Sequence, residues 1–152
     1  MDFFKFNRRQ IRDHFKQEAK LVIVGLDNAG KTTMLKSMAQ EETGNICPTT
    51  GINRKSIIQD GVKLNVMDLG GQRELRPYWN THLKGGDGIN GIIYVVDSSD
   101  EVRFQESKME LDNLLIEDEL FNIPLLVFAN KQDIETALDS EQIVDELCLL
   151  GI

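Results

Sequence analysis

A glycine-rich segment that directly follows a hydrophobic run constrains the fold of this chain more than any other feature. Residues 20–25 read KLVIVG, which is typical of a strand buried on both faces, and residues 25–33 read GLDNAGKTT. The segment matches the pattern G-x-x-x-x-G-K-[ST] at every defined position, namely Gly25, Gly30, Lys31 and Thr32. Such glycines let backbone N–H groups turn inward around an anion. The sequence therefore predicts a phosphate site between a strand and a helix, with an ordinary glycine turn as the alternative.

The residues of this phosphate loop have separate expected roles. Lys31 can reach the β- and γ-phosphates of a nucleoside triphosphate, and the hydroxyl of Thr32 can ligate Mg²⁺. We expect the whole loop to contact the nucleotide: Gly25, Leu26, Asp27, Asn28, Ala29, Gly30, Lys31, Thr32 and Thr33. The loop alone does not distinguish GTP from ATP.

Apolar runs alternate with helical patterns along the rest of the chain. The expected strands are residues 20–25, 56–59, 62–68, 92–97 and 125–130, and the expected helices are residues 33–39, 101–120 and 140–150. Asp60 and Gly61 separate the second and third runs and are a strong hairpin signal. The pattern predicts an α/β fold of the P-loop NTPase type, with a doubly wound, mostly parallel sheet and one antiparallel hairpin. Ligands of such sheets bind at the carboxyl ends of the strands.

A polar motif follows the last predicted strand, where the base of a nucleotide would lie. It reads Asn130-Lys131-Gln132-Asp133. The Asp133 carboxylate can accept two hydrogen bonds from guanine, whereas adenine would leave it unpaired at a cost of about 1–3 kcal/mol. Asn130 can contact the base and brace the phosphate loop, and the stem of Lys131 can cover the ring. The motif alone could be a polar turn, but beside a phosphate loop it predicts guanine.

Another motif, Asp68-Leu69-Gly70-Gly71-Gln72, also follows a predicted strand. Asp68 suits a role in holding Mg²⁺ through a water molecule, and Gln72 can orient an attacking water. Gly71 can bring its N–H to a γ-phosphate, and we expect Gly70 to belong to the same set of nucleotide contacts. Taken alone, the motif could be a turn that ends the strand.

Thr49 supplies a hydroxyl on the loop between the first predicted helix and the hairpin. Alone it would be a structural residue, but with the other motifs it is the natural second hydroxyl ligand of Mg²⁺ beside Thr32. Loss of the γ-phosphate would then release both the Thr49 loop and the segment around Gln72. Two segments that respond to one phosphate indicate a switch.

Composition excludes several classes of function. The chain has 152 residues, enough for one domain with a real core, and its formal net charge of −8 argues against a broad grip on nucleic acid polymers. No run approaches the roughly 20 apolar residues of a membrane span. Asp2 excludes N-myristoylation, which requires glycine at that position, so any membrane contact is expected to be peripheral. Cys47 and Cys148 are expected to be free thiols.

Together the motifs resemble those of the Arf/Arl small GTPases. The resemblance rests on GLDNAGKTT, PTTGIN, DLGGQRELRPYW and NKQD, and it extends from about Lys20 to the end of the chain. It implies a GTPase domain over residues 18–152 that binds GTP or GDP with Mg²⁺ and hydrolyses GTP slowly. Thr32 and Thr49 would hold the metal, and Gln72 would be the catalytic residue.

The resemblance also implies partners and a setting in the cell. An exchange factor would turn the switch on and a GTPase-activating protein would turn it off. Asp27 beside the γ-phosphate would hinder unaided hydrolysis, and no arginine of the chain is assigned as a finger, so one supplied in trans is expected. Effectors such as carriers of lipid-modified cargo would link a monomeric, cytoplasmic protein to protein and vesicle trafficking. It could lie peripherally on Golgi, ciliary or flagellar membranes.

The N-terminal segment fits the same picture. In residues 1–17, Phe4, Ile11 and Phe15 recur at helical spacing and predict an amphipathic helix. The resemblance implies that this helix docks on the protein with GDP and meets a membrane or partner with GTP, coupled to a register shift of the hairpin over residues 56–68. A helix packed permanently on the core is the alternative.

Several positions depart from the family pattern. Ile52, Met67 and His82 stand where family members usually carry aromatic residues of an effector surface, so the choice of effector stays open. The glycine-rich segment over residues 85–91 is about three residues longer than usual. The last strand, the second guanine loop and the last helix of the family are expected to be missing after Ile152, which would weaken base affinity and leave an apolar face uncovered. A non-hydrolysing adaptor, a truncated inactive form and an ATP-using enzyme remain the alternatives.

Overall fold

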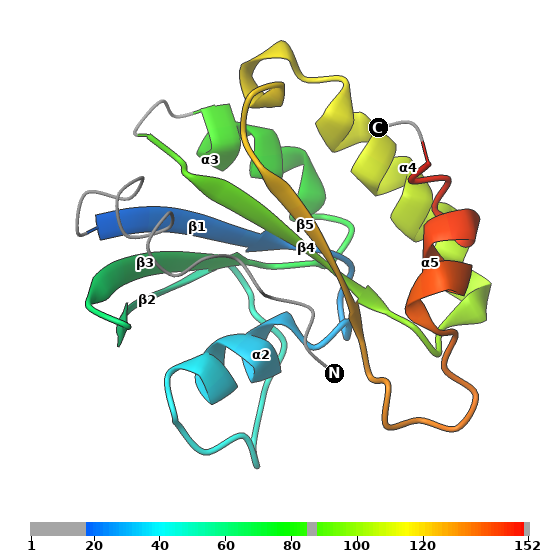
Figure 1. Ribbon diagram of the computed structural model, residues 1–152, viewed down its shortest axis with the longest axis horizontal. Helices are drawn as coiled ribbons and strands as arrows, with labels where there is room; N and C mark the ends of the chain where they lie inside the picture. The colour runs from blue at the N-terminus through cyan, green and yellow to red at the C-terminus, as the bar shows by residue number, and fades with distance from the viewer. Residues whose placement is uncertain (1–17, 85–87, 151–152) are drawn as a thin grey trace.

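The computed structural model of the chain describes residues 18–84 and 88–150, and Figure 1 shows their arrangement. The predicted helix over residues 1–17 and the start of the glycine-rich segment, residues 85–87, lie outside the described residues. A five-stranded sheet forms the centre of the molecule, in the order β2-β3-β1-β4-β5. Its strands are β1 (Glu18–Val24), β2 (Ile52–Gln59), β3 (Val62–Leu69), β4 (Gly91–Asp97) and β5 (Leu125–Asn130).

The pairing of the strands confirms the predicted topology. β1 runs parallel to both β3 and β4, β4 runs parallel to β5, and β2 alone is antiparallel to its neighbour β3 among the described strands. Asp60 and Gly61 form the turn of this hairpin with φ angles of 50° and 82°. Glycine adopts this left-handed region freely and aspartate tolerates it, which is why the pair is a hairpin signal. The fold is the predicted mostly parallel sheet with one antiparallel hairpin.

Helices cover both faces of the sheet, as Figure 1 shows. They are α2 (Lys31–Met38), α3 (Trp79–Lys84), α4 (Phe104–Leu115) and α5 (Ser140–Glu146), with short 3-10 turns η1 (Arg76–Tyr78), η2 (Glu101–Arg103) and η3 (Asp118–Leu120). Helices α3, α4 and α5 pack on one face over a core that includes Tyr94 and Leu111. Helix α2 packs on the other face, where Leu35 meets Ile23 and Val95. The sheet is therefore doubly wound.

The predicted helix over residues 101–120 is wrong in its extent. It is divided into η2, α4 and η3, and α4 is separated from η3 because Glu117 has an extended backbone (φ −80°, ψ 113°) that ends the helical path. Met109 of α4 is 58% exposed. Leu111 and Leu114 lie on the buried face of α4, and Met109 is about 200° away from Leu111 at 100° per residue.

Other element boundaries also differ from the predictions. β2 begins at Ile52 rather than at residue 56, and α2 begins at Lys31 rather than at residue 33. Gly91 is the first residue of β4, because it pairs with Leu21 of β1. α5 begins with a capping box between Asp139 and Gln142 and ends at Glu146 instead of reaching residue 150.

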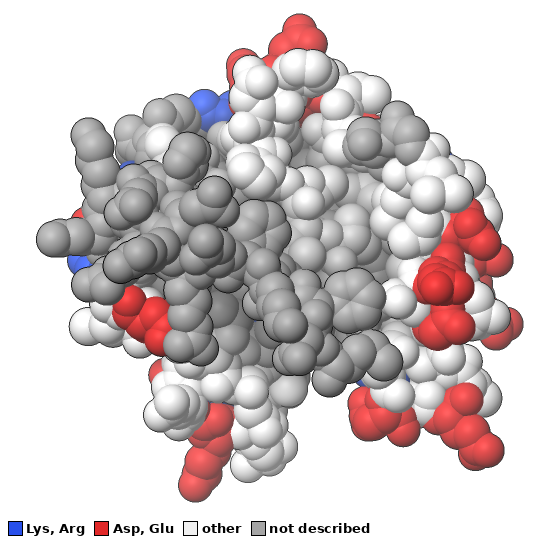
Figure 2. Space-filling view, viewed as in Figure 1, with Lys and Arg blue, Asp and Glu red and all other residues white. Residues whose placement is uncertain are grey.

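The surface carries both acidic and apolar regions. Figure 2 shows Asp and Glu side chains gathered along the side where α5 lies, in keeping with the net charge of −8. On β5 the side chains of Leu126 and Phe128 are 39% and 40% exposed. Cys47 and Cys148 are exposed free thiols, as predicted. Across residues 18–84 and 88–150, none of the helices is both long enough and apolar enough to span a bilayer.

Candidate nucleotide-binding site

The phosphate loop joins β1 to α2 in a conformation that requires its two glycines. Gly25 and Gly30 have φ angles of 141° and 91°, in the region that disfavours a side chain. A Cβ on Gly25 would lie 2.2 Å from Val95 O, and one on Gly30 would lie 2.2 Å from Asn130 Nδ2. The pattern G-x-x-x-x-G therefore reflects both backbone angles and close packing against two neighbouring strands.

Lys31 lies folded over the loop and is 6% exposed. Its Nζ donates to Gly25 O at 2.9 Å and to Leu26 O at 2.7 Å. Burial lowers the pKa of Lys31 to about 8, although Asp68 and Asp27 oppose that shift. The ammonium is thus held at the base of the loop by carbonyl acceptors that a phosphate could replace.

Two hydroxyls and one carboxylate meet beside the loop. Thr32 Oγ1 donates to Asp68 Oδ2 at 2.6 Å and lies 2.9 Å from Thr49 Oγ1, and Thr49 Oγ1 donates to the same oxygen at 3.5 Å. Asp68 is fully buried, and burial raises its pKa against the opposing hydrogen bonds from the threonines. The structure brings together the three residues that the sequence assigned to Mg²⁺.

The unpaired oxygen of Asp68 tests whether a metal would fit here. Asp68 Oδ1 is buried and has no hydrogen-bond partner. A buried acceptor of this kind is costly unless a donor completes it, and a water on a hard cation is such a donor. Among the described residues no three His, Cys, Asp or Glu side chains cluster, so a metal at this place would depend on hydroxyl, water and phosphate oxygens. The donor set fits Mg²⁺ bound together with a phosphate.

A cleft of about 270 Å³ opens over the loop. It is lined by Asp27, Asn28, Gly30, Lys31, Thr32, Thr33, Ile46, Cys47, Pro48, Thr49, Gly71 and Gln72. These residues come from three separate segments of the chain, residues 27–33, 46–49 and 71–72. A larger cleft of about 520 Å³ lies between the hairpin and α3, but no residue of the phosphate loop lines it.

The segment after β3 packs directly against the phosphate loop. Asp27 N donates to Gly71 O at 3.1 Å, and a Cβ on Gly71 would lie 2.4 Å from that nitrogen. The neighbouring Gly70 O accepts a hydrogen bond of 2.9 Å from Trp79 Nε1, and Trp79 is buried. Only glycine permits the backbone at position 71 to lie this close to the phosphate loop, and as a result the next residue, Gln72, lines the cleft.

The Asn130-Lys131-Gln132-Asp133 motif begins at the end of β5, and its members take different positions. Asn130 Nδ2 donates to Ala29 O at 2.8 Å, which is the predicted brace on the phosphate loop. Lys131 has a positive φ of 63° and its Nζ lies 2.7 Å from Asp97 Oδ2. Burial raises the pKa of Asp97, but hydrogen bonds from Lys131 and Ser99 outweigh burial and hold it below the usual value. Asp133 is exposed and does not line the phosphate cleft.

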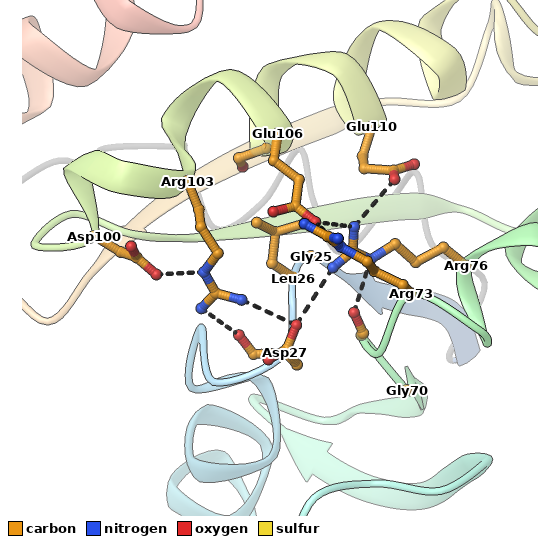
Figure 3. Close-up of polar contacts among 12 residues, drawn as sticks. Gly25, Leu26, Asp27, Gly70, Arg73, Arg76, Asp100, Arg103, Glu106 and Glu110 are labelled. Carbon is orange, nitrogen blue, oxygen red and sulfur yellow. Dashed lines mark hydrogen bonds and ion pairs between the residues drawn. The ribbon is translucent and has the colours of Figure 1, made fainter.

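Sequence reasoning missed two arginines that meet at Asp27, shown in Figure 3. Arg103 Nη1 lies 3.0 Å from Asp27 Oδ1, and Arg76 Nη2 lies 3.3 Å from the same oxygen. Arg76 also donates to Gly71 O, Glu106 and Glu110. No local pattern could have revealed these pairs, because Asp27 is 49 residues from Arg76 and 76 residues from Arg103.

Comparison with known proteins decides the family. A family model described as the ADP-ribosylation factor family matches residues 6–152. The chain belongs to the ADP-ribosylation factor (Arf) family. It is 47% identical over 135 residues to ADP-ribosylation factor-like protein 3 of Chlamydomonas reinhardtii, covering 89% of this chain and 75% of that protein. It is 46% identical over 134 residues to the protein of that name from Caenorhabditis elegans, covering 88% and 71% respectively.

A solved structure supports the same assignment for the fold of this Arf-family chain. The Arl6 BBS3 small GTPase from Trypanosoma brucei, solved with the bound nucleotide analogue GppNp, matches with a TM-score of 0.78 and 32% identity. The match covers 87% of this chain and 78% of that one. The P-loop GTPase fold predicted from the motifs is thereby confirmed, as is the resemblance to the Arf/Arl small GTPases.

Proposed function

We propose that this chain is a GTP-binding molecular switch that hydrolyses GTP to GDP and phosphate slowly and with Mg²⁺. The cleft in which the phosphate loop, Thr49 and Gly71–Gln72 meet carries the proposal. A protein that only held phosphate would need the loop alone. Two further segments at the γ-phosphate end would sense whether that phosphate is present, and their release after hydrolysis would be the switching event.

Nucleotide binding would replace hydrogen bonds that residues of the phosphate loop make with one another by bonds to phosphate oxygens. The Lys31 ammonium can turn from the carbonyls of Gly25 and Leu26 to phosphate oxygens, and the inward N–H groups of the loop can neutralise further charge. Thr32 and Thr49 would hold Mg²⁺, with Asp68 behind a water molecule. When bound, the metal would neutralise charge on the β- and γ-phosphate oxygens.

Hydrolysis would depend on positioning and not on a covalent protein intermediate. Gln72 lines the cleft next to Gly71 and would orient the attacking water. The exposed Asp133 would accept the two donors of guanine, with Asn130 and Lys131 beside it. Asn130 would then connect the base site to the phosphate loop through its bond to Ala29 O.

The family resemblance supports a role in protein and vesicle trafficking. In this proposal an exchange factor and a GTPase-activating protein control the nucleotide state of a monomer. Effectors such as carriers of lipid-modified cargo would bind the GTP state at the cytoplasmic side of Golgi, ciliary or flagellar membranes. The identity of 47% with an ADP-ribosylation factor-like protein 3 over most of the chain supports this class of effector.

The test of catalysis is single-turnover hydrolysis of preloaded radiolabelled GTP. We expect Gln72→Leu to slow hydrolysis at least about tenfold, because the attacking water loses its orienting group. Gln105→Leu is the matched control, since Gln105 is exposed on α4 and outside the cleft. Equal and slow rates for wild type and Gln72→Leu, also with an activating protein, would support the non-hydrolysing adaptor instead.

The test of base selection is competition between nucleotides. GTP should displace a fluorescent guanine nucleotide from the wild type, whereas ATP should not at the same concentration. Asp133→Asn should weaken GTP binding by about tenfold or more, because one paired carboxylate contact is lost. Displacement by ATP as effective as displacement by GTP would contradict guanine selection.

A further inference from the structure

Asp27 of the phosphate loop places a carboxylate on the wall of the proposed phosphate cleft. Asp27 lines this cleft, and its side chain is 42% exposed. It lies next to Gly71 and Gln72, because its backbone N–H bonds to Gly71 O. A free carboxylate at this place would repel the γ-phosphate of GTP more strongly than it would repel GDP, which lacks that group.

Arg103 contacts Asp27 through two of its guanidinium nitrogens, as Figure 3 shows. Its Nη1 lies 3.0 Å from Asp27 Oδ1 and its Nη2 donates to Asp27 O at 3.0 Å. Its Nε donates to Asp100 Oδ2 at 2.6 Å, so the guanidinium is oriented from the other side as well. With its donors engaged in this way, Arg103 is held as a fixed counter-charge and is not free to swing into the cleft.

Arg76 completes the arrangement from the segment after β3. Its side chain is 4% exposed and its Nη2 lies 3.3 Å from Asp27 Oδ1. The same guanidinium bonds Gly71 O at 2.8 Å, Glu106 Oε1 at 2.8 Å and Glu110 Oε1 at 3.1 Å. Arg76 therefore divides its charge among several acceptors, which leaves Arg103 as the main partner of Asp27.

We propose that Arg103 is a positioning residue that neutralises Asp27 and turns its carboxylate away from the γ-phosphate, so that the cleft accepts GTP as well as GDP. The inference rests on the proposed function, since it concerns the same cleft. Arg103 acts through Asp27 and does not itself touch the nucleotide. The ratio of GTP affinity to GDP affinity is then set by an ion pair between Asp27 of the phosphate loop and Arg103 of η2.

The experiment measures affinities for fluorescent GTP and GDP analogues with Arg103→Gln, Asp27→Asn and the double variant. We expect Arg103→Gln to weaken GTP binding at least about fivefold while changing GDP binding less than about twofold. In the Asp27→Asn background, Arg103→Gln should have no further effect on the ratio of the two affinities. Arg103→Lys should have a GTP affinity between those of Arg103→Gln and wild type, because lysine keeps the positive charge but lacks the second nitrogen that contacts Asp27.

Lys108→Gln is the control, because it also removes one positive charge, but Lys108 lies in α4 and pairs with Asp112 rather than with Asp27. It should leave the ratio of GTP to GDP affinity unchanged. If Arg103→Gln does not fold, Arg103→Lys takes its place: it should weaken GTP binding more than GDP binding and lose that effect in the Asp27→Asn background. Either of two results overturns the inference.

The first such result is an equal loss of GTP and GDP affinity in Arg103→Gln, which would mean a merely structural role. The second is a selective loss of GTP binding that persists with Asp27→Asn, which would mean that Arg103 contacts the nucleotide directly. A wild type that binds neither nucleotide would instead overturn the proposed function, and this inference with it. The inference fails while the proposed function stands only if the wild type binds both GTP and GDP and one of these two results is found.

Discussion

Asn130 ties the phosphate loop to β5 through a single hydrogen bond with a fixed chemical direction. Its amide Nδ2 donates to Ala29 O at 2.8 Å, and the approach is close because Gly30 has no Cβ. An acceptor in place of that amide would face the carbonyl oxygen of Ala29 without a proton between them. The residue thus contributes to the shape of the loop before any base is bound.

We expect Asn130→Asp to lower the free energy of unfolding of the nucleotide-free protein by about 1–3 kcal/mol, because a partly buried acceptor is left unpaired. Urea unfolding measures this. Gln132→Glu is a matched control, since Gln132 Nε2 also donates to a main-chain carbonyl, Leu138 O at 2.8 Å, but is exposed. It should cost less than about 0.5 kcal/mol. Equal losses for the two variants would contradict a specific brace.

Glu106 predicts a pH dependence of stability. Hydrogen bonds from Arg73 and Arg76 lower the pKa of Glu106 from 4.5 to about 2. Because the folded-state pKa is depressed, this contribution to stability is complete above about pH 4.5 and is lost as the pH falls toward about 2. Glu106→Gln should therefore be less stable than wild type at pH 7, and its stability should fall less between pH 5 and pH 3.

Urea midpoints measured across that pH range test the expectation. Arg73→Gln should give an intermediate curve, because it removes one of the two donors to Glu106 and Arg73 is 76% exposed. Curves for wild type and Glu106→Gln that run parallel from pH 5 to pH 3 would show that this carboxylate does not govern acid stability.

At the level of elements, apolar runs in the sequence predicted strands, and pairing between strands decided the boundaries that such runs do not mark. β5 has the predicted bounds, because LLVFAN is a continuous apolar run between turn signals. The first four residues of β2, from Ile52 to Lys55, were not predicted, since INRK has no apolar run. They are extended because they pair with β3, where Ile52 lies opposite Leu69, and such pairing is invisible in the segment itself.

The candidate site divides in the same way between local and distant information. The phosphate loop and the two later motifs were predictable because each needs only a few adjacent residues and a strand before it. The cluster of Thr32, Thr49 and Asp68 followed from the expected sheet edge, and the structure brings its members within hydrogen-bond distance. The pairing of Asp27 with Arg76 and Arg103 could not be predicted, because it depends on how η1 and η2 pack against the loop.

The hairpin turn gives a prediction for a whole element. Gly61 has a φ of 82° with open space around its Cα, so an alanine there would be strained by the backbone and not by a clash. We expect Gly61→Ala to destabilise the protein by about 1 kcal/mol in urea unfolding. Gly44→Ala is the control, since Gly44 also has open space but no positive φ, and it should be neutral or slightly stabilising. Equal effects of both variants would contradict a turn-specific strain.

For the whole molecule, the site must attract an anion against a net charge of −8. Lys31, Arg76 and Arg103 gather around the phosphate loop, where the buried Asp68 and the cleft-lining Asp27 supply the opposing charges. The distant carboxylates on the side of α5 are screened beyond about 8–10 Å at ordinary ionic strength. Phosphate affinity is therefore a property of the loop and its immediate neighbours.

Binding of nucleotide to this local site should stabilise the entire domain, because the unfolded chain has no preformed phosphate loop. GTP with Mg²⁺ at about 100 times its Kd should add about 2.7 kcal/mol, which for a domain of this size raises the Tm by about 5–11 °C. ATP at the same concentration should give little shift, and EDTA should remove much of the shift given by GTP. Asp133→Asn should keep the Tm of the nucleotide-free protein and lose most of the GTP shift, because Asp133 is exposed and would contribute through guanine alone. Equal shifts with ATP and GTP in thermal unfolding would contradict both guanine selection and the proposed switch.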